Sequence, residues 1–323
     1  MQDYAPIILP LVFAVIIAFG IFVYVMLDGF DLGLGILFLA APSDAARDTM
    51  MRSVAPVWDG NETWLVLGGV VLFAAFPLAY AVILPALYLP LVLMLIGLIL
   101  RGVAFEFRFK AERSRRLWDW AFAGGSVLAT FMQGIALGAF VQGFPVLDRQ
   151  YGGGPFDWLT PFSVLTGFAL IAGYMLLACG WLIMKTEGDL LDWAYGQAER
   201  ALVVVVGFIL VVSVWTPLQS ADVAGRWFSW PNIIMVSPVP IVTAVATLAL
   251  YRAIRLRQVH QPFVLAVALF VLAYTGIAVS FFPYIIPPRI TIWQAAAAPE
   301  SQLFLLYGLV PILPIILAYT VWT

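Results

Sequence analysis

The sequence predicts an all-α integral membrane protein, and three observations support this fold class: the composition, the length of the apolar runs and the placement of the basic residues. Of the 323 residues, 63% are hydrophobic and only 11% are charged, whereas a typical soluble domain has roughly 25% charged residues. So few polar groups cannot cover the surface of a water-soluble domain of this size. Most of the chain is therefore expected to face lipid.

Nine continuous apolar runs are long enough to cross a bilayer, which requires about 20 residues. The strands of a membrane barrel are about half as long and alternate in polarity, so these runs predict helices packed in bundles. Because the segments between the runs are short, we expect residues 1–323 to form a single polytopic membrane domain. The predicted spans are Ile7–Leu27 (with an apolar continuation to Ala40), Trp58–Phe76, Ala79–Leu100, Trp118–Gln142, Thr160–Met184, Arg200–Leu218, Pro231–Tyr251, Pro262–Ile286 and Leu303–Val321.

The Lys and Arg residues fall mainly on one side of the predicted spans. Only Arg149, Arg226 and Arg289 lie on the other side. Basic loops remain in the cytoplasm, so this asymmetry predicts a periplasmic N-terminus and, with nine spans, a cytoplasmic C-terminus. The basic residues on the predicted cytoplasmic side are Arg47, Arg52, Arg101, Arg108, Lys110, Arg113, Arg115, Arg116, Lys185, Arg200, Arg252, Arg255 and Arg257.

Ionisable residues at the ends of the first three spans are the candidate functional groups. Each costs about 2.5–3.5 kcal/mol at the centre of a spanning helix, so such residues are usually retained for a reason. The predicted topology brings all of them to the cytoplasmic side. They form three sequence pairs, namely Asp28 with Asp31, Asp59 with Glu62, and Arg101 with Glu106.

The spacing within the two acid pairs indicates two alternative roles. Residues three apart lie on one helix face, so each pair presents two carboxyl groups together. Such pairs can conduct protons from the cytoplasm or bind a cation. Alternatively, the acids only cap helix ends and pair with arginines at the membrane interface, which is reasonable for Asp59 in a first helical turn. Asp28 and Asp31 lie within a long apolar run, which favours a functional role for them.

Other residue patterns exclude several functions. The one histidine, His260, lies in a predicted basic loop at the membrane edge, whereas haem is usually held by an axial His in a protein core. No Cys–His or carboxylate–His spacing predicts a metal site, and no Gly-rich phosphate-binding motif is present. The net charge of −2 gives no electrostatic basis for nucleic-acid binding.

Several motifs in the first 145 residues, taken in order, resemble subunit II of the cytochrome bd-type quinol oxidases. The later spans agree with that family mainly in number and length. The matching segments are Asp28-Gly-Phe-Asp-Leu-Gly-Leu-Gly35, Ala55-Pro-Val-Trp-Asp-Gly-Asn-Glu-Thr-Trp-Leu65, Phe73-Ala-Ala-Phe-Pro77, Leu100-Arg-Gly-Val-Ala-Phe-Glu-Phe-Arg108 and Trp118-Asp-Trp120.

The resemblance implies a heterodimeric terminal oxidase in a bacterial plasma membrane, which oxidises quinol and reduces O2 to water with protons from the cytoplasm. In that family the haems, of b and d type, belong to subunit I, so this chain is expected to ligate no cofactor itself. Subunit II supports the haem-bearing subunit, and small single-span accessory subunits and membrane lipid are further partners. Some members also hold a quinone in subunit II as a structural ligand.

The resemblance also implies roles for individual residues. Asp59, in the Trp-Asp-Gly-Asn motif, and Glu106 correspond to acids of the cytoplasmic proton inlet, with Glu106 replacing the Asp of some members. Asp28, Asp31 and Glu62 are further proton-transfer candidates, although some members have Gln in place of Glu62. Arg101 is expected to support these acids by ion pairing.

Two other classes of protein remain as alternatives. A cation- or proton-coupled secondary transporter would use Asp28, Asp31, Asp59 and Glu62 as coupling acids, but transporters often have a matching site in a second repeat. The second half of this chain has no comparable acids within its spans. A structural membrane scaffold, in which the acids serve only for docking, is the third interpretation.

Overall fold

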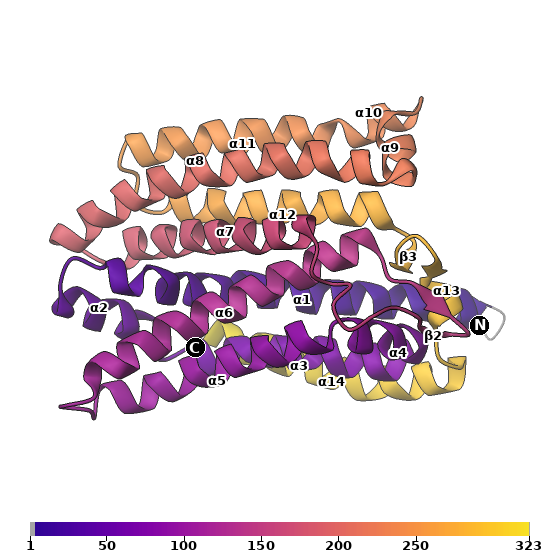
Figure 1. Cartoon of the computed structure of the whole chain (residues 1–323), viewed down its shortest axis with the longest axis horizontal. Helices are drawn as coiled ribbons and strands as arrows, with labels where there is room; N and C mark the ends of the chain where they lie inside the picture. The colour runs from indigo at the N-terminus through magenta and orange to yellow at the C-terminus, as the bar shows by residue number, and fades with distance from the viewer. Residues whose placement is uncertain (1–3, 323) are drawn as a thin grey trace.

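A computed structural model describes residues 4–322 as a set of long helices that run along one common direction (Figure 1). Eight helical segments among these residues are long and apolar enough to cross a membrane. They are α1 (Ala5–Leu37) with η2 (Phe38–Ala40), α5 (Tyr88–Arg108), α6 (Arg115–Gln142), α7 (Pro161–Lys185), α8 (Gly188–Gln219), α10 (Asn232–Val236) with α11 (Pro238–Arg255), α12 (Gln261–Phe281) and α14 (Pro299–Trp322).

The remaining predicted span corresponds to helix α3 (Trp58–Ala75), whose polar first turn sets it apart from the eight apolar segments. The sequence prediction differs from the structure at the following span. The predicted helix beginning at Ala79 is divided into α4 (Pro77–Ala86) and α5. Pro85 lies in the last turn of α4, and a proline lacks the N–H needed to continue the helical hydrogen bonds. The predicted span therefore begins too early, and α5 alone is the long helix.

Short elements lie at the two ends of the long helices. Helix α2 (Asp44–Val54) follows α1, and the side chain of Ser43 caps it by accepting a hydrogen bond from the Ala46 N–H. The other short elements lie at the end that contains the N-terminus (Figure 1). They are the hairpin of β1 (Val146–Leu147) and β2 (Gln150–Tyr151), the hairpin of β3 (Tyr284–Ile286) and β4 (Ile290–Thr291), and helices α9 (Ala221–Phe228) and α13 (Ile292–Ala295).

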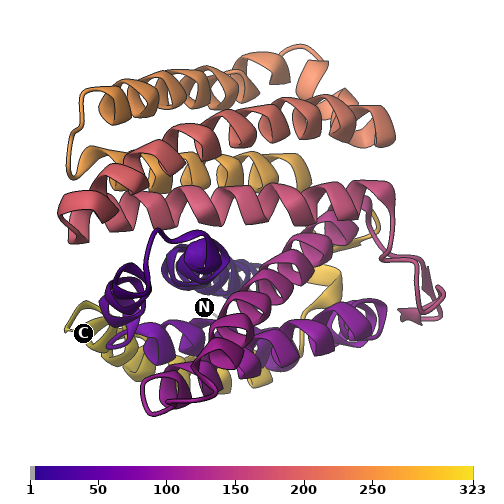
Figure 2. The same cartoon turned by 60° about the vertical axis from the view of Figure 1, so that its left-hand side comes forward.

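Helix α1 lies at the centre and packs against α3, α6 and α7 (Figures 1 and 2). Glycines allow α7 to approach it closely. A Cβ atom on Gly29 would lie 2.8 Å from the Tyr174 ring, and one on Gly33 would overlap the backbone of Tyr174. Small residues permit such close helix approach in membranes. This close contact between α1 and α7 fixes where Asp28 and Asp31, which lie beside Gly29 on α1, are placed along the helices.

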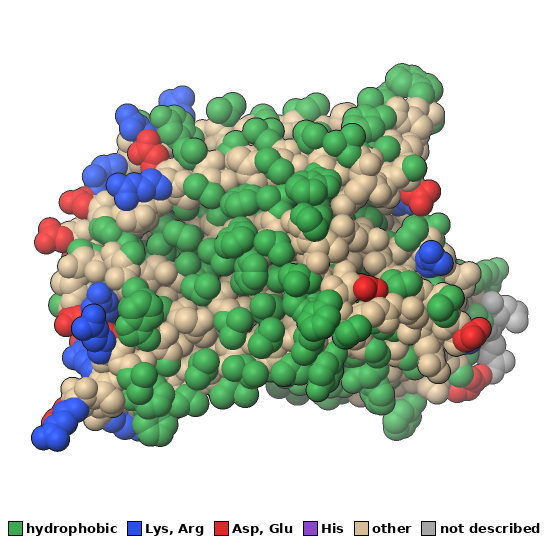
Figure 3. Space-filling model, viewed as in Figure 1, with side chains coloured by type: hydrophobic (Ala, Val, Ile, Leu, Met, Phe, Trp, Pro, Cys, Tyr) green, Lys and Arg blue, Asp and Glu red, His purple; other side chains and the backbone are tan. Residues whose placement is uncertain are grey.

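The surface separates into an apolar middle and charged ends (Figure 3). Large hydrophobic side chains such as Val66, Val70 and Ile99 are more than half exposed along the middle of the helices. Lys and Arg side chains gather at the end where α1 and α5 finish and α6 begins, which we call the basic end. A wide apolar band of this kind is expected for a chain surrounded by lipid.

Candidate functional site

The predicted acids of α1 and α3 meet Arg101 of α5 in a buried cluster near the basic end. Arg101 Nη1 donates a 2.6 Å hydrogen bond to Asp28 Oδ1. Its Nη2 atom lies 3.9 Å from Asp31 Oδ2 and 3.7 Å from Glu62 Oε1. Asn61 Nδ2 donates a 2.6 Å hydrogen bond to Asp31 Oδ2 and a longer one to the Leu27 carbonyl. We call Asp28, Asp31, Asn61, Glu62 and Arg101 the Arg101 cluster.

Local helix geometry brings these side chains together. The three-residue spacing of Asp28 and Asp31 puts both carboxyl groups on the face of α1 that meets α3 and α5. Trp58 at the start of α3 stacks on Phe105 of α5, with ring centroids 4.9 Å apart. This stacking sets the first turn of α3 beside Arg101, which lies one turn before Phe105.

Burial makes the cluster electrostatically strong. Asp28 and Arg101 are 0% exposed and Asp31 is 1% exposed, while the Glu62 side chain retains 26% exposure. Charges in a low-dielectric interior interact more strongly than in water, and an uncompensated charge there is expensive. The one guanidinium group therefore has a large stabilising effect on the acids, and Glu62 is the member with direct access to the surroundings.

A buried chain of hydrogen bonds extends from the cluster toward α6 and α7. Tyr24, one turn before Asp28 on α1, faces Asp28 and accepts a 2.7 Å hydrogen bond from Gln133 Nε2. The Tyr174 hydroxyl donates a 2.8 Å hydrogen bond to Gln133 Oε1. The chain links α1, α6 and α7 around Asp28 and holds that carboxyl group in a polar environment.

The other two predicted acids lie outside the cluster. Asp59 is exposed in the first turn of α3, and it is close enough to Glu62 to act on it electrostatically. Glu106 is exposed on α5 and pairs with Lys110 at 3.3 Å, so it does not join Arg101. The structure thus brings Asp28, Asp31, Glu62 and Arg101 together and leaves Asp59 and Glu106 at the surface of the basic end.

A second buried arginine, Arg108, ties together α2, α5 and α6 at the basic end. It is 1% exposed and donates hydrogen bonds of 2.5 Å to Asp119 and 2.7 Å to Asp48. Asp48 also accepts a hydrogen bond from Arg115. The sequence motifs did not predict this network, because Arg108 was expected at the membrane interface with the other loop arginines. The only sequence signal was Asp119 between Trp118 and Trp120.

The hydrogen bonds to Asp48 predict that the stability of the protein depends on pH. Partial burial alone would raise the pKa of Asp48, but hydrogen bonds from Arg115 and Arg108 outweigh it and hold the pKa below its ordinary value. Asp48 therefore stabilises the fold above its ordinary pKa, and this contribution is lost as the pH falls through the lowered value. Asp48→Asn is expected to cost about 1.5–3 kcal/mol at neutral pH, the usual effect for hydrogen bonds to charged groups.

Thermal unfolding in detergent at several pH values tests this prediction. The difference in Tm between wild type and Asp48→Asn should shrink as the pH falls into the acid range. Asp44→Asn is the matched control, because the 2.5 Å pair between Asp44 and Arg47 involves an Asp44 side chain that is 76% exposed, and exposed pairs contribute little. A Tm difference that stays constant from neutral to acid pH would contradict the role of Asp48.

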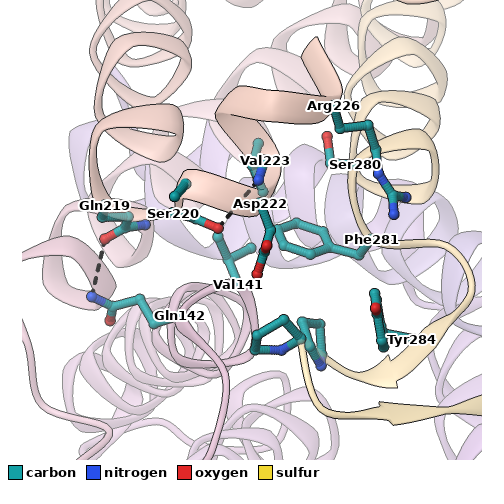
Figure 4. Close-up of a pocket in the computed structure, with 13 residues that line it drawn as sticks. Val141, Gln142, Gln219, Ser220, Asp222, Val223, Arg226, Ser280, Phe281 and Tyr284 are labelled. Atoms are coloured by element: carbon teal, nitrogen blue, oxygen red, sulfur yellow. Dashed lines mark hydrogen bonds between the residues drawn. The ribbon is translucent and has the colours of Figure 1, made fainter. Parts of the chain in front are cut away.

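A polar cavity of about 340 Å³ lies at the opposite end of the molecule, between α6, α8, α9 and the loop after α12 (Figure 4). Gln142 Nε2 donates a 3.2 Å hydrogen bond to Gln219 Oε1 at its wall. Among residues 4–322, the buried Nε2 atom of Gln219 has no hydrogen-bond partner. Gln219 also borders an apolar groove along α8 that is lined by Leu210, Val211, Val214, Trp215 and Leu218.

The described part of the chain contains no group of three or more His, Cys, Asp or Glu residues arranged to hold a metal ion. His260 is exposed at the N-terminus of α12 rather than in a buried pocket. The geometry of the Arg101 cluster instead suits the binding and transfer of protons, since carboxyl groups of graded exposure lie close together.

Comparisons with known proteins agree with this description. A family model described as cytochrome bd terminal oxidase subunit II matches residues 9–323. The chain is 28% identical to cytochrome bd-I ubiquinol oxidase subunit 2 of Escherichia coli K12, over 93% of this chain and 89% of that protein. It is 30% identical to cytochrome bd ubiquinol oxidase subunit 2 of Bacillus subtilis 168, over 61% of this chain and 60% of that protein.

The fold also matches a solved structure. The chain superposes on a chain of the bd oxidase from Geobacillus thermodenitrificans with a TM-score of 0.76, covering 97% of this chain and 96% of that one at 16% identity. Together with the eight apolar helices, the family match identifies a multi-pass protein of the bacterial plasma membrane. The chain belongs to the cytochrome bd terminal oxidase subunit II family and is a subunit of a quinol oxidase.

Proposed function

We propose that this chain supports a haem-bearing subunit I and supplies carboxyl groups for proton uptake from the cytoplasm, for the reduction of O2 to water. The observation that carries this proposal is the Arg101 cluster, in which the buried Asp28 and Asp31 lie beside the partly exposed Glu62 near the basic end. Protons for oxygen chemistry within a membrane must cross an apolar region, and intramembrane acids are the usual means.

The orientation in the membrane is part of the proposal. We propose that residues 1–323 form one membrane domain with nine spans, in which α3 is the ninth, and that the N-terminus is periplasmic and the C-terminus cytoplasmic. The gathering of Lys and Arg side chains at the basic end supports a cytoplasmic position for that end (Figure 3), because basic residues are retained there. The Arg101 cluster then lies on the side from which protons are taken up.

The route begins at the exposed acids Asp59 and Glu106. From Asp59, a proton passes to the half-buried Glu62, which lies 3.7 Å from Arg101. Glu62 exchanges with Asp31 on α1, beside Asp28, which is the other acid of the pair and faces the Tyr24 hydroxyl. Glu106 serves as a second surface acid, which pairs with Lys110.

We propose that the haems b and d are ligated by subunit I and not by this chain. Haem iron is typically held by buried His, Met or Cys ligands, and His260 is exposed at a helix N-terminus. When bound, these haems supply the electron transfer and oxygen chemistry of the complex. The residues of this chain act only by packing and by holding protons.

We also propose that the cavity at Gln219 accommodates a structural quinone. A quinone carbonyl can accept a hydrogen bond from the unpartnered Nε2 atom of Gln219, and the isoprenoid tail can follow the apolar groove beside Trp215 and Leu218. Ligand sites typically combine an apolar lining with a few such polar groups. Gln219→Leu should reduce the quinone that remains bound through purification, as measured by solvent extraction and chromatography.

A matched control uses Gln142→Leu, which removes the neighbouring amide but leaves the Gln219 amide in place. That variant should retain more quinone than Gln219→Leu. Equal quinone content in Gln219→Leu and wild type would exclude this cavity as the quinone site. Phospholipid extracted in place of quinone would assign the cavity to membrane lipid.

Purification of the tagged chain from its native membrane tests the functional proposal as a whole. Subunit I is expected to co-purify, together with any small single-span accessory subunits. The reduced-minus-oxidised spectrum should contain the bands of haem b and haem d, and the preparation should consume O2 with quinol as donor. A spectrum without these bands would contradict the oxidase proposal and leave the proton-coupled transporter as the alternative.

A further inference from the structure

The Arg101 cluster contains more acidic than basic groups. Asp28, Asp31 and Glu62 lie around a single guanidinium group, that of Arg101. Asn61 and the nearby hydroxyl groups of Tyr24 and Tyr174 are neutral, and the exposed Asp59 adds a further negative charge near Glu62. With all three acids ionised, the cluster would carry a net charge of −2, and a buried uncompensated charge costs several kcal/mol.

The three carboxyl groups differ in their relation to Arg101. Asp28 makes a direct 2.6 Å charge-assisted hydrogen bond and is therefore the counterion. Asp31 lies 3.9 Å from the nearest guanidinium nitrogen, which is beyond hydrogen-bonding distance, and receives only the neutral amide of Asn61. Glu62 is also beyond that distance, but its partial exposure allows water to solvate its charge.

Several buried polar atoms of the cluster have no hydrogen-bond partner in the part of the chain that the structure describes. Among residues 4–322, the Arg101 cluster has buried atoms without a hydrogen-bond partner on three acids, namely Asp28 Oδ2, Asp31 Oδ1 and Glu62 Oε1, and on Arg101, namely Nε and Nη2. Both aspartates are at least 99% buried. Ionised carboxyl groups only accept hydrogen bonds, so two such oxygens on one helix face lack a donor. A proton bound to one of these aspartate oxygens turns it from an acceptor into a donor and removes one negative charge from the cluster.

We propose that Asp31 holds an exchangeable proton on Oδ1, with Asp28 as the fixed counterion of Arg101 and Glu62 as the group that exchanges the proton with water. Asp31 rather than Asp28 is assigned because protonation of Asp28 would leave Arg101 without its one direct ionic hydrogen bond. This assignment of Asp31 adds to the proposed proton route, and it rests on that route only for the direction in which the proton is exchanged.

Infrared spectroscopy of the assembled oxidase tests the assignment. A protonated carboxyl group has a carbonyl stretch that is separate from that of a carboxylate, and it shifts in D2O when its proton exchanges. We expect such a band in oxidase labelled with ¹³C at the aspartate carboxyl groups. In Asp31→Glu the band should leave the aspartate-labelled spectrum and appear in the spectrum of glutamate-labelled protein. Retention of the same aspartate-labelled band in Asp31→Glu would overturn the proposal.

The exchange route is tested separately. Glu62→Gln should leave the Asp31 band in place and slow its hydrogen–deuterium exchange several-fold, whereas Glu112→Gln, an exposed loop acid, should change neither. Exchange at the wild-type rate in Glu62→Gln would overturn the role of Glu62. Asp59→Asn separates the two proposals, because normal turnover in that variant with an intact Asp31 band would reject the inlet and leave the proton on Asp31 assigned.

Discussion

Replacing Arg101 by methionine is expected to cause the largest loss of stability of any single substitution in the chain. Arg101 is fully buried and, among the residues that the structure describes, is the only cation within ion-pairing distance of Asp28, Asp31 and Glu62. Removing one partner of a buried ion pair typically costs about 3–5 kcal/mol, because the remaining charge is left uncompensated. The amount of assembled, haem-containing oxidase in the membrane and its Tm should both fall strongly.

A second substitution separates charge from packing. Arg101→Met combined with Asp28→Asn removes both members of the 2.6 Å ion pair and leaves no uncompensated carboxylate at that position. The double variant should therefore assemble better than Arg101→Met alone. The coupling energy between the two sites, measured as a double-mutant cycle of Tm or denaturant midpoint, should be clearly different from zero. Additive effects would show that the side chains act independently and would contradict the description of the cluster.

Arg101→Lys is an informative intermediate. Lysine keeps the charge but presents a single ammonium group, whereas the guanidinium reaches Asp28 through Nη1 and faces Asp31 and Glu62 through Nη2. The lysine variant should assemble to a greater extent than Arg101→Met and remain less stable than wild type.

The features predicted correctly from the sequence are those that follow from continuous apolar length and charge placement. Long apolar runs required helices, and Arg101 was expected to pair with acids at the ends of the first three spans. Arg101 directly follows a predicted span that ends on the same side as these acids, so its pairing with Asp28 was within reach of the sequence. The basic end followed from counting Lys and Arg residues in loops.

The features missed depend on three-dimensional packing. Hydropathy gives no sign that the helix ends after Ala86, because the residues on both sides of the break between α4 and α5 are apolar. Arg108 has the sequence context of a loop arginine, yet the folding of α2 and α6 around it buries it against Asp119. Gln133 of α6 and Tyr174 of α7 are more than 40 residues apart and meet where Gly134 and Gly167 allow these two helices to approach closely.

The acids at the surface were the most specific functional candidates, and the structure leaves them exposed. Among the hydrogen bonds within residues 4–322, none joins Asp59 or Glu106 to the Arg101 cluster, and Glu106 pairs with Lys110. An exposed position is what the first group of a proton inlet requires, because it must exchange with water. We therefore propose that protons enter at Asp59 and are held by the buried acids of the Arg101 cluster.

Asp59→Asn is expected to have the largest effect on activity among substitutions that leave assembly intact. Asparagine keeps the size and the helix-start position of the side chain, so folding and haem content should be unchanged. The amide cannot release or accept a proton as a carboxyl group does. Quinol-dependent O2 consumption per haem should therefore fall by about tenfold or more, a change in activation free energy of about 1.4 kcal/mol.

Turnover per haem in Asp59→Asn tests directly whether Asp59 takes part in proton uptake. Asp44→Asn is the matched control, since Asp44 is an exposed acid at the same end that pairs with Arg47 outside the cluster. We expect low turnover with normal b- and d-haem bands in Asp59→Asn, and normal turnover in Asp44→Asn. Wild-type turnover in Asp59→Asn, or the loss of the haem bands together with activity, would contradict the role of Asp59 in proton uptake.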